Sequence, residues 1–366
     1  MTDFFPASYS ASRAKFCATA QCAGFELESH PWPESTTGPE GEPLSVEVAI
    51  LPAAGPDAPC LVISSGLHGI EGFFGAAVQH HLLEQWTAHP PPSSIRYVLI
   101  HALNPFGFAW LRRANEDNVD LNRSFFSTGE ERPVNSGYAA LDPLLNPRRP
   151  PSRWEPFLLK VLLAIARAGG KGPVKQAVAG GQYDFPQGLF YGGREPTATQ
   201  RLLEQHLRRW TGGSPRVVHL DFHTGLGRSG TWKLLVDYAP DARQLATLET
   251  CFGRDNTQLP SEAAPGIAYQ TRGSLGAWCV SRSAPAEYVY TCAEFGTYSD
   301  LQVLSALRAE NQAHHWGLPS AAAHARRRLM EMFCPGSPSW RRQVLDEAQR
   351  LVAAAAKGLA GQSTTL

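Results

Sequence analysis

Two histidines and a glutamate have the spacing and surroundings of ligands for a divalent metal ion. His68 and Glu71 stand three positions apart in Ser64–Gly72, directly after an apolar run, and His223 ends a second apolar run far downstream. The carboxyl ends of parallel strands meet at one edge of a sheet, so the three side chains can converge there. Two imidazoles and one carboxylate form the open ligand set of hydrolytic zinc, which leaves a fourth position for water. The pattern predicts a metal-dependent hydrolase.

Each of these residues also has an ordinary structural explanation. A loop histidine followed by a carboxylate at a helix N-terminus, each satisfied by hydrogen bonds, would give the same pair as His68 and Glu71. A histidine that ends a buried strand, as His223 does, can be a hydrogen-bonded core residue. The neighbouring elements and motifs therefore have to decide between the two interpretations.

The apolar runs belong to a regular alternation of strands and helices. Short runs rich in Val, Ile, Leu and Tyr, bounded by Gly, Pro or polar turns, are typical of strands. They are Val46–Leu51, Cys60–Ser64, Arg96–His101, Arg216–Phe222, Trp232–Tyr238 and Glu287–Ala293. Helical patterns cover Phe73–Gln85, Pro156–Ala168, Thr197–Trp210, Leu301–Glu331 and Ser339–Ala360. The alternation predicts a layered α/β/α fold.

Composition narrows the functional class. The 366 residues are 43% hydrophobic, which is enough for a large core. Lys plus Arg balance Asp plus Glu at 33 each, so we expect no binding to nucleic acid or membranes. The N-terminus lacks the pattern of a secretory signal, and the seven cysteines form no tight pairing motif. We therefore expect a cytoplasmic protein. Its oligomeric state is not predicted.

The stretch from about residue 127 to 193 differs from the rest because it has few strand signals. It contains a proline- and arginine-rich segment, one helical pattern and the glycine-rich run Gly180–Pro186. Long stretches of this kind inside compact domains are usually functional or disordered. We expect residues 1–366 to form a single domain with this insertion packed on it. We also expect the insertion to form one wall of the substrate cleft, although a peripheral, stabilising flap would have the same sequence character.

Four further motifs surround the predicted metal ligands in a fixed order. An Asn104-Pro-Phe-Gly turn leads into Arg113, and Asp120-Leu-Asn-Arg follows. Tyr269-Gln-x-x-Gly-Ser-x-x-x-Trp and a strand end that contains Glu294 come later. With these five ordered elements, the chain resembles the zinc carboxypeptidase family and its succinylglutamate desuccinylase and aspartoacylase relatives. It is most similar to the compact bacterial branch of unassigned function, over about Val46 to Thr297.

The resemblance implies a three-layer α/β/α fold with a mixed, mostly parallel central sheet. It also implies one zinc ion per chain and a role for each matched residue. The implied zinc ligands are His68, Glu71 and His223, and the implied catalytic residues are Glu294 as general base, Arg113 as carbonyl-polarising cation and Tyr269 as mobile cap. Asn122 and Arg123 would bind the terminal carboxylate of a small peptide or N-acyl amino acid.

Some of these assignments have alternatives at the level of the residues. Arg112 is adjacent to Arg113 and could be the inward-facing arginine. Arg123 could instead form a structural ion pair with Asp120 or Glu116. Tyr269 could be a loop anchor. The implied activity is that of a carboxypeptidase or an N-acyl amino acid deacylase. There are two alternatives. One is an esterase or small-amide hydrolase with the same centre, and the other is a relative that binds metal or peptide without turnover.

Overall fold

An eight-stranded mixed sheet forms the centre of the computed structural model, which describes residues 4–127, 129–152, 154–260, 272–284 and 286–361. The strands lie in the order β1-β2-β4-β3-β5-β8-β6-β7. Their bounds are β1 (Glu26–Pro31), β2 (Ser45–Leu51), β3 (Cys60–Ser65), β4 (Arg96–His101), β5 (Arg216–Thr224), β6 (Trp232–Leu235), β7 (Thr257–Gln258) and β8 (Glu287–Phe295).

The four central strands, β4, β3, β5 and β8, run parallel to one another, whereas β2 and β6 join them as antiparallel neighbours. Every residue of β3 is buried, and in β5 and β8 only the first residue is not. Such continuous burial is expected of a parallel sheet, which is covered on both faces. The mixed, mostly parallel sheet confirms the predicted fold class.

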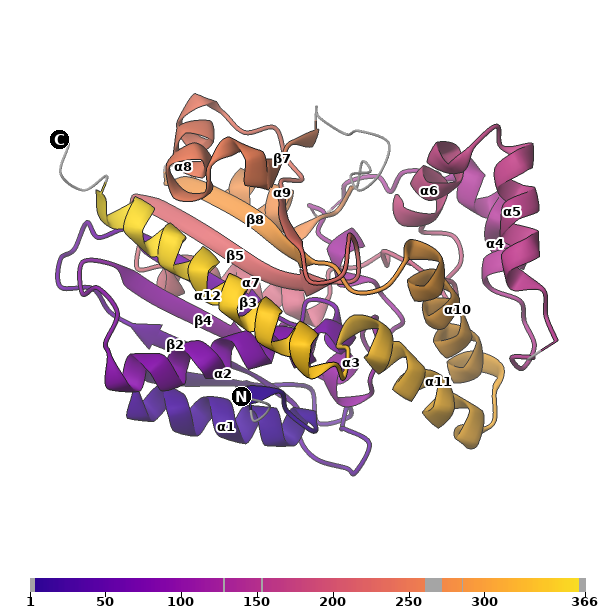
Figure 1. Cartoon of the computed structure of the whole chain (residues 1–366), viewed down its shortest axis with the longest axis horizontal. Helices are drawn as coiled ribbons and strands as arrows, with labels where there is room; N and C mark the ends of the chain where they lie inside the picture. The colour runs from indigo at the N-terminus through magenta and orange to yellow at the C-terminus, as the bar shows by residue number, and fades with distance from the viewer. Residues whose placement is uncertain (1–3, 128, 153, 261–271, 285, 362–366) are drawn as a thin grey trace.

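Helices cover both faces of this sheet. In Figure 1, α12 crosses in front of the sheet with α1 and α2, and α7 lies behind it. The helices outside the insertion are α1 (Tyr9–Cys22), α2 (Gly72–Ala88), α3 (Pro105–Ala109), α7 (Ala198–Trp210), α8 (Ala242–Phe252), α9 (Leu275–Arg282), α10 (Asp300–Trp316), α11 (Pro319–Phe333) and α12 (Pro338–Gly361). Within the described part of the chain, no helix combines the length and apolar character that a membrane span requires.

The prediction of one helical stretch over Leu301–Glu331 is wrong in one respect, because the structure has two helices there, α10 and α11. Gly317 leaves the helical conformation after α10, and α11 begins with Pro319 at its first position. Proline lacks the N–H that would continue α10 but fits the first turn of a new helix, where that N–H has no partner. The predicted strand Trp232–Tyr238 is also shorter, since β6 ends at Leu235.

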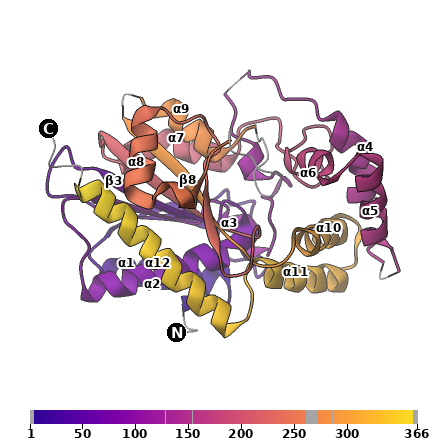
Figure 2. The same cartoon turned by 45° about the horizontal axis from the view of Figure 1, so that its top comes forward.

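The insertion contains three helices rather than the single one predicted. They are α4 (Ser136–Leu145), α5 (Phe157–Arg167) and α6 (Lys171–Ala179). Tyr138, Leu145 and Val178 form a small hydrophobic core of their own, against which Leu304 of α10 packs. Figure 2 shows the three helices beside α10, at the end of the molecule away from α1 and α2. The insertion is thus a helical unit packed on the C-terminal helices.

Candidate metal centre

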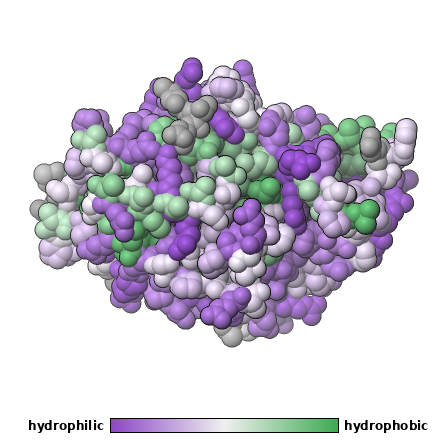
Figure 3. All heavy atoms as spheres, turned by 90° about the horizontal axis from the view of Figure 1, so that it is seen from below, coloured by the Kyte–Doolittle hydropathy of each residue, from purple (hydrophilic) through white to green (hydrophobic). Residues whose placement is uncertain are grey.

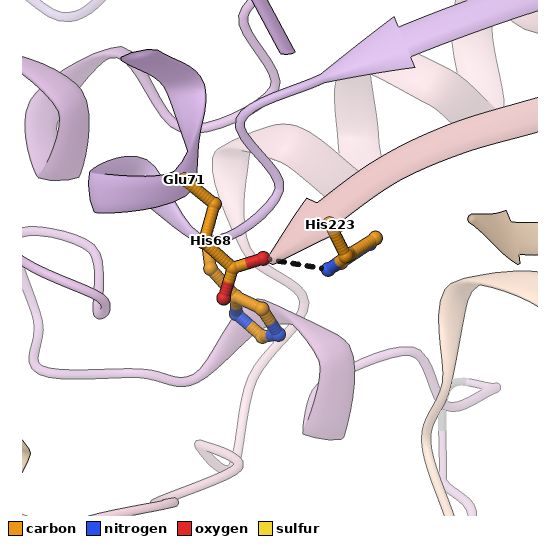
Figure 4. Close-up of side chains that lie close together, drawn as sticks. All are labelled: His68, Glu71 and His223. Atoms are coloured by element: carbon orange, nitrogen blue, oxygen red, sulfur yellow. Dashed lines mark ion pairs between the residues drawn. The ribbon is translucent and has the colours of Figure 1, made fainter. Parts of the chain in front are cut away.

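The three predicted metal ligands converge at the carboxyl edge of the sheet. His68 follows β3 and precedes the short 3₁₀ helix η2 (Gly69–Glu71), which ends in Glu71, and His223 is the penultimate residue of β5. One ligand atom from each residue lies within 4.8 Å of the other two, and each residue is only 2% exposed. Figure 4 shows the carboxylate of Glu71 beside the ring of His68 and joined to His223 by an ion pair. The structure therefore brings together residues that are up to 155 positions apart.

Close backbone packing fixes the turn that carries His68 and Glu71. The N–H groups of Gly69 and Ile70 donate to the carbonyl oxygens of Arg113 and Arg112 at 3.2 and 2.8 Å. A Cβ on Gly69 would lie 2.1 Å from the backbone of Gly107, so only glycine fits there. The segment after β3 is thus held against α3.

His223 is held by carboxylates on both sides of its ring. Its Nδ1 lies 3.0 Å from Oε2 of Glu71, and its Nε2 lies 2.6 Å from Oδ2 of Asp221. Asp221 also accepts hydrogen bonds from Ser64 at 2.6 Å and Tyr290 at 2.9 Å. Burial opposes the charged imidazole, but Asp221 and Glu71 outweigh it and place the pKa of His223 well above its usual value. Asp221 therefore orients the ring, with Nδ1 toward Glu71.

The guanidinium of Arg113 lies among the candidate ligands. It donates to Nε2 of His68 at 2.6 Å, to Oε1 of Glu71 at 3.1 Å and to Oδ2 of Asp120 at 2.9 Å. Asp120 also approaches Nδ1 of His68, at 3.4 Å. Burial, with the charge of Arg113, lowers the pKa of His68 well below its usual value. A neutral imidazole with a free lone pair is the form that binds metal.

These observations fit a divalent metal ion. Two imidazoles and a carboxylate are borderline-soft donors in the combination found in open zinc sites. In this structure the cation that His68 and Glu71 contact is the guanidinium of Arg113, which shows that the cluster accepts positive charge. The carboxylates of Asp120 and Asp221 lie behind the two imidazoles, as supporting residues do at metal centres.

Glu294 lies beside this cluster on the neighbouring strand. It pairs with His223 in the register of β5 and β8, and together with Cys292 these residues form a second group of possible ligands within 4.8 Å. Its Oε1 accepts a hydrogen bond from the N–H of Leu226 at 2.8 Å. Burial, followed by the negative charge of Glu71, raises the pKa of Glu294 to about 7. The structure thus places a second carboxylate next to the candidate ligands.

The structure distinguishes between the two adjacent arginines. Arg112 is 1% exposed and points away from the cluster, where it donates to Glu310 and Asn118 at 2.8 and 2.9 Å. Arg113 points toward His68 instead. The choice of Arg113 over Arg112 as the inward-facing residue therefore agrees with the geometry.

Arg123 lies in a different environment from the one expected of a carboxylate-binding residue. Its Nε and Nη2 both donate to the carbonyl oxygen of Ala179, at 3.0 and 2.7 Å, and its Nη1 donates to the carbonyl of Asn122 at 2.6 Å. Ala179 ends α6, and the last carbonyls of a helix lack partners and carry partial negative charge. The side chain of Asn122 accepts from the N–H of Leu275 at 3.0 Å. Both residues are thus bonded to the backbone in this structure.

The second half of the insertion contacts Arg113 and Arg123. The ring of Phe190 lies 5.5 Å from the guanidinium of Arg113, and the hydroxyl of Tyr183 donates to the carbonyl of Arg123 at 3.0 Å. The insertion therefore lies next to the candidate site, and its role as a wall of the substrate cleft stays a prediction. Tyr269, the predicted mobile cap, lies outside the described residues.

Sequence reasoning pointed to Asp221 as an orienting partner of His223 but missed two other supporting polar residues, Asp120 and Ser64. Asp120 contacts both His68 and Arg113, although its sequence position suggested a partner for Arg123. Ser64 bonds to both Asp221 and His219, at 2.6 and 2.7 Å. The available signal was a serine or aspartate within four residues of a predicted ligand or motif residue. That signal is too common to be specific.

Comparison with solved structures reveals the class of fold. Bovine thrombin-activatable fibrinolysis inhibitor matches with a TM-score of 0.50 and 12% identity, over 97% of this chain and 97% of that chain. Carboxypeptidase A from Helicoverpa armigera matches with 0.45 and 13%, over 87% and 73%. Murein-tripeptide amidase from Escherichia coli O157 matches with 0.37 and 18%, over 82% and 91%. The protein has a carboxypeptidase-like fold.

A family model identifies the chain more closely. The model described as Protein of unknown function (DUF2817) matches residues 5–347, and the chain belongs to that family. A comparison with curated proteins gave no match.

Proposed function

We propose that the protein is a zinc-dependent hydrolase that cleaves an amide bond next to a free carboxylate, as a carboxypeptidase or an N-acyl amino acid deacylase. One zinc ion would be held by His68, Glu71 and His223. The observation that carries the proposal is the convergence of three buried ligand atoms within 4.8 Å, with Glu294 paired to His223 on the adjacent strand. No structural need explains so many buried ionisable groups in one place, and such clusters are typical of functional sites.

The residues around the cluster have the chemistry that amide hydrolysis requires. A bound zinc ion would supply Lewis acidity, which lowers the pKa of water and polarises a carbonyl group. Glu294 can accept a proton from the attacking water and return it to the leaving amine. Arg113 can stabilise the oxyanion that develops on the substrate carbonyl, because Asp120 holds its guanidinium beside the cluster before reaction.

For the substrate we propose a small peptide or an N-acyl amino acid, with its carboxylate on Arg123 and Asn122. A guanidinium matches a carboxylate bidentately, and the amide of Asn122 adds a neutral donor. Binding would require the substrate carboxylate to replace the carbonyl of Ala179 as the partner of Arg123. A full negative charge is a stronger acceptor than a carbonyl, so the exchange is favourable once the substrate is positioned.

The contact between Arg123 and Ala179 also supports a second candidate function. If the guanidinium stays on the helix end, the site has no charged anchor there, and an ester or small amide without a carboxylate becomes the better substrate. A third possibility, a relative that binds without turnover, is less favoured because Glu294 and Arg113 both lie at the cluster.

The decisive experiment is a mass-spectrometric activity screen of the full chain loaded with zinc. Matched substrates would be N-acyl amino acids and short peptides, each as free acid and as C-terminal amide, with simple esters as a third set. Turnover of the acids alone supports the first function, and equal turnover of acids and amides supports the second. A lack of turnover on every set, with zinc bound stoichiometrically, would contradict both hydrolase proposals.

A further inference from the structure

Helix α5 is apolar on nearly all its sides, although it lies at the surface. Phe157 and Val161 face inward and are buried. On the other side, Leu158, Leu159, Leu162 and Leu163 are exposed by 55, 57, 53 and 48%. A helix that is hydrophobic all round is normally buried. The outward leucines therefore indicate that something covers this face.

The exposed residues form one continuous stripe. At about 100° per residue, Leu158, Leu162, Leu159 and Leu163 follow one another around the helix over about 140°. Lys160 and Arg167 lie next to them along one edge. Trp154, three residues before α5, is 93% exposed. Figures 1 and 2 both place α5 at the outer end of the molecule, and Figure 3 shows hydrophobic residues at that same end.

Most of the exposed large hydrophobic side chains of the protein are concentrated at this helix. Among the described residues, nine large hydrophobic side chains are exposed, and five of them belong to this patch of Trp154 and the four leucines. A contiguous exposed apolar patch is expected to mark a site of interaction with a protein or a membrane. We call these five residues the α5 patch.

The charge around the α5 patch indicates what covers it. Residues 145–180 contain seven Lys or Arg and one acidic residue, in a chain whose total charge is zero. Of these cations, Arg148 is paired with Asp142 at 3.6 Å and Lys175 with Asp300 at 3.3 Å, whereas Arg167 and Lys171 are exposed. The acidic residue, Glu155, is itself neutralised by Arg308 at 2.9 Å and Lys160 at 3.0 Å. The patch is thus an apolar stripe in a strongly basic surrounding, and its partner must offer both apolar and negative groups.

A second copy of the chain would offer apolar groups to the patch but no negative ones. In a two-fold dimer the same surface faces itself, so exposed basic residues such as Arg167 and Lys171 would lie near their own copies. Like charges brought together oppose association. Nucleic acid would satisfy the basic residues but would leave the leucines without an apolar partner.

We infer that the α5 patch docks on the surface of an anionic lipid bilayer. The leucines and Trp154 would enter the boundary between headgroups and acyl chains, while the basic residues contact anionic headgroups. With 11 residues, α5 is too short to span a bilayer and would lie along its surface. This inference does not depend on the proposed catalytic function. It differs from the expectation of no membrane partner, which was drawn from the balanced total charge and stays untested.

Vesicle co-sedimentation with the full chain tests the inference. We expect binding to phosphatidylcholine vesicles that contain phosphatidylglycerol, weak binding to phosphatidylcholine alone, and a decrease with added salt. The double variant Leu158→Ser/Leu162→Ser should bind at least about tenfold more weakly. Arg167→Gln/Lys171→Gln should also lose about tenfold or more, since each basic residue near the surface is worth about fivefold.

The control variants alter exposed leucines elsewhere. Leu245→Ser/Leu318→Ser changes positions that are 36 and 72% exposed and should leave vesicle binding unchanged. We expect each variant to fold, because all the altered side chains lie at the surface. Circular dichroism of each variant checks this.

Three outcomes would overturn the inference. One is vesicle binding that the patch variants do not weaken. Another is absence of vesicle binding with a concentration-dependent dimer that Leu158→Ser/Leu162→Ser dissociates, which would assign the patch to a second copy. The third is equal binding to soluble polyglutamate in the parent and the leucine variant, which would indicate a purely electrostatic acidic partner.

Discussion

His223 and Glu294 are direct neighbours across the parallel strands β5 and β8, each one residue before its strand ends. Paired residues in adjacent strands point to the same face of a sheet, so the two side chains emerge together at its carboxyl edge. The backbone hydrogen bonds of two wholly buried strand ends therefore set the position of Glu294 relative to the imidazole. Such a rigid arrangement suits a group that must act beside a metal ligand.

The metal prediction concerns His68 and His223. Changing either to Ala removes one of three ligand atoms, so zinc content should fall sharply from about one per chain. Elemental analysis after purification without chelators measures this. The control is His89→Ala, an exposed histidine whose loss should leave the zinc content unchanged. Full zinc occupancy in both ligand variants would refute the assignment.

A second prediction concerns Asp221, which bonds to Nε2 of His223 at 2.6 Å. Asp221→Asn retains the shape but loses the charge that orients and polarises the imidazole. Zinc affinity should fall about 10–100-fold, because residues behind metal ligands typically contribute that much. Competition with a chelator provides the dissociation constant. Asp57→Asn, at an exposed loop position, is the matched control. An unchanged affinity in Asp221→Asn would mean that Asp221 is only a packing residue.

A third prediction assigns proton transfer to Glu294. Glu294→Gln preserves size and hydrogen bonding but cannot accept a proton, so kcat should fall by about 10²–10⁴-fold while zinc remains bound. Steady-state kinetics and metal analysis on the same preparation separate the two effects. Glu249→Gln, an exposed glutamate on α8, should behave like the parent. Unchanged turnover in Glu294→Gln would exclude the role.

A fourth prediction distinguishes the two orientations of Arg123. If its guanidinium leaves Ala179 to bind the substrate, Arg123→Ala should lose one to two decades in kcat/KM for acids but little for amides. A charged hydrogen bond of about 1.5–3 kcal/mol has that effect. The ratio of kcat/KM for each acid–amide pair is the measurement. A ratio that Arg123→Ala leaves unchanged would indicate that Arg123 only binds the end of α6.

The convergence of His68, Glu71 and His223 could be predicted from local patterns. Cys60–Ile63 of β3 is a continuous apolar run and Val217–Phe222 of β5 is rich in apolar residues, so the histidines that follow them are conspicuous. The orientation of Arg123 could not be predicted, since its partner is a backbone carbonyl 56 residues away in a helix with weak sequence signals. Strand β1 was missed because it is a largely polar edge strand, whose hydrogen bonds to β2 define it better than its hydrophobicity. The roles of the site residues, including Tyr269, the bound zinc, the substrate, the cytoplasmic location and a single domain over the whole chain stay predictions.

The last prediction concerns the carboxyl of Asp237, whose Oδ1 is buried although the residue as a whole is partly exposed. Its Oδ1 has no hydrogen-bond partner among the described residues. A Cβ added to Gly276 would lie only 2.2 Å from this oxygen, so the carboxyl is packed against the glycine. Burial raises the pKa of Asp237 to about 6, from 3.8. The unfolded chain therefore releases this proton near pH 4, whereas the folded protein keeps it until about pH 6. Ionisation favours the unfolded state across that interval, so this group lowers the free energy of unfolding as pH rises.

Replacing Asp237 with Asn removes the titration and should stabilise the protein above pH 6. The difference in free energy of unfolding between variant and parent should rise from its value near pH 4 by about 1–3 kcal/mol and then stay constant above about pH 7. Urea unfolding at a series of pH values measures it, and the subtraction cancels the titration of the other groups. Asp57→Asn, at an exposed position, should give a difference that does not vary with pH. A difference for Asp237→Asn that is flat from pH 4 to 8, or that falls with rising pH, would show that the carboxyl is already ionised at low pH in the folded protein.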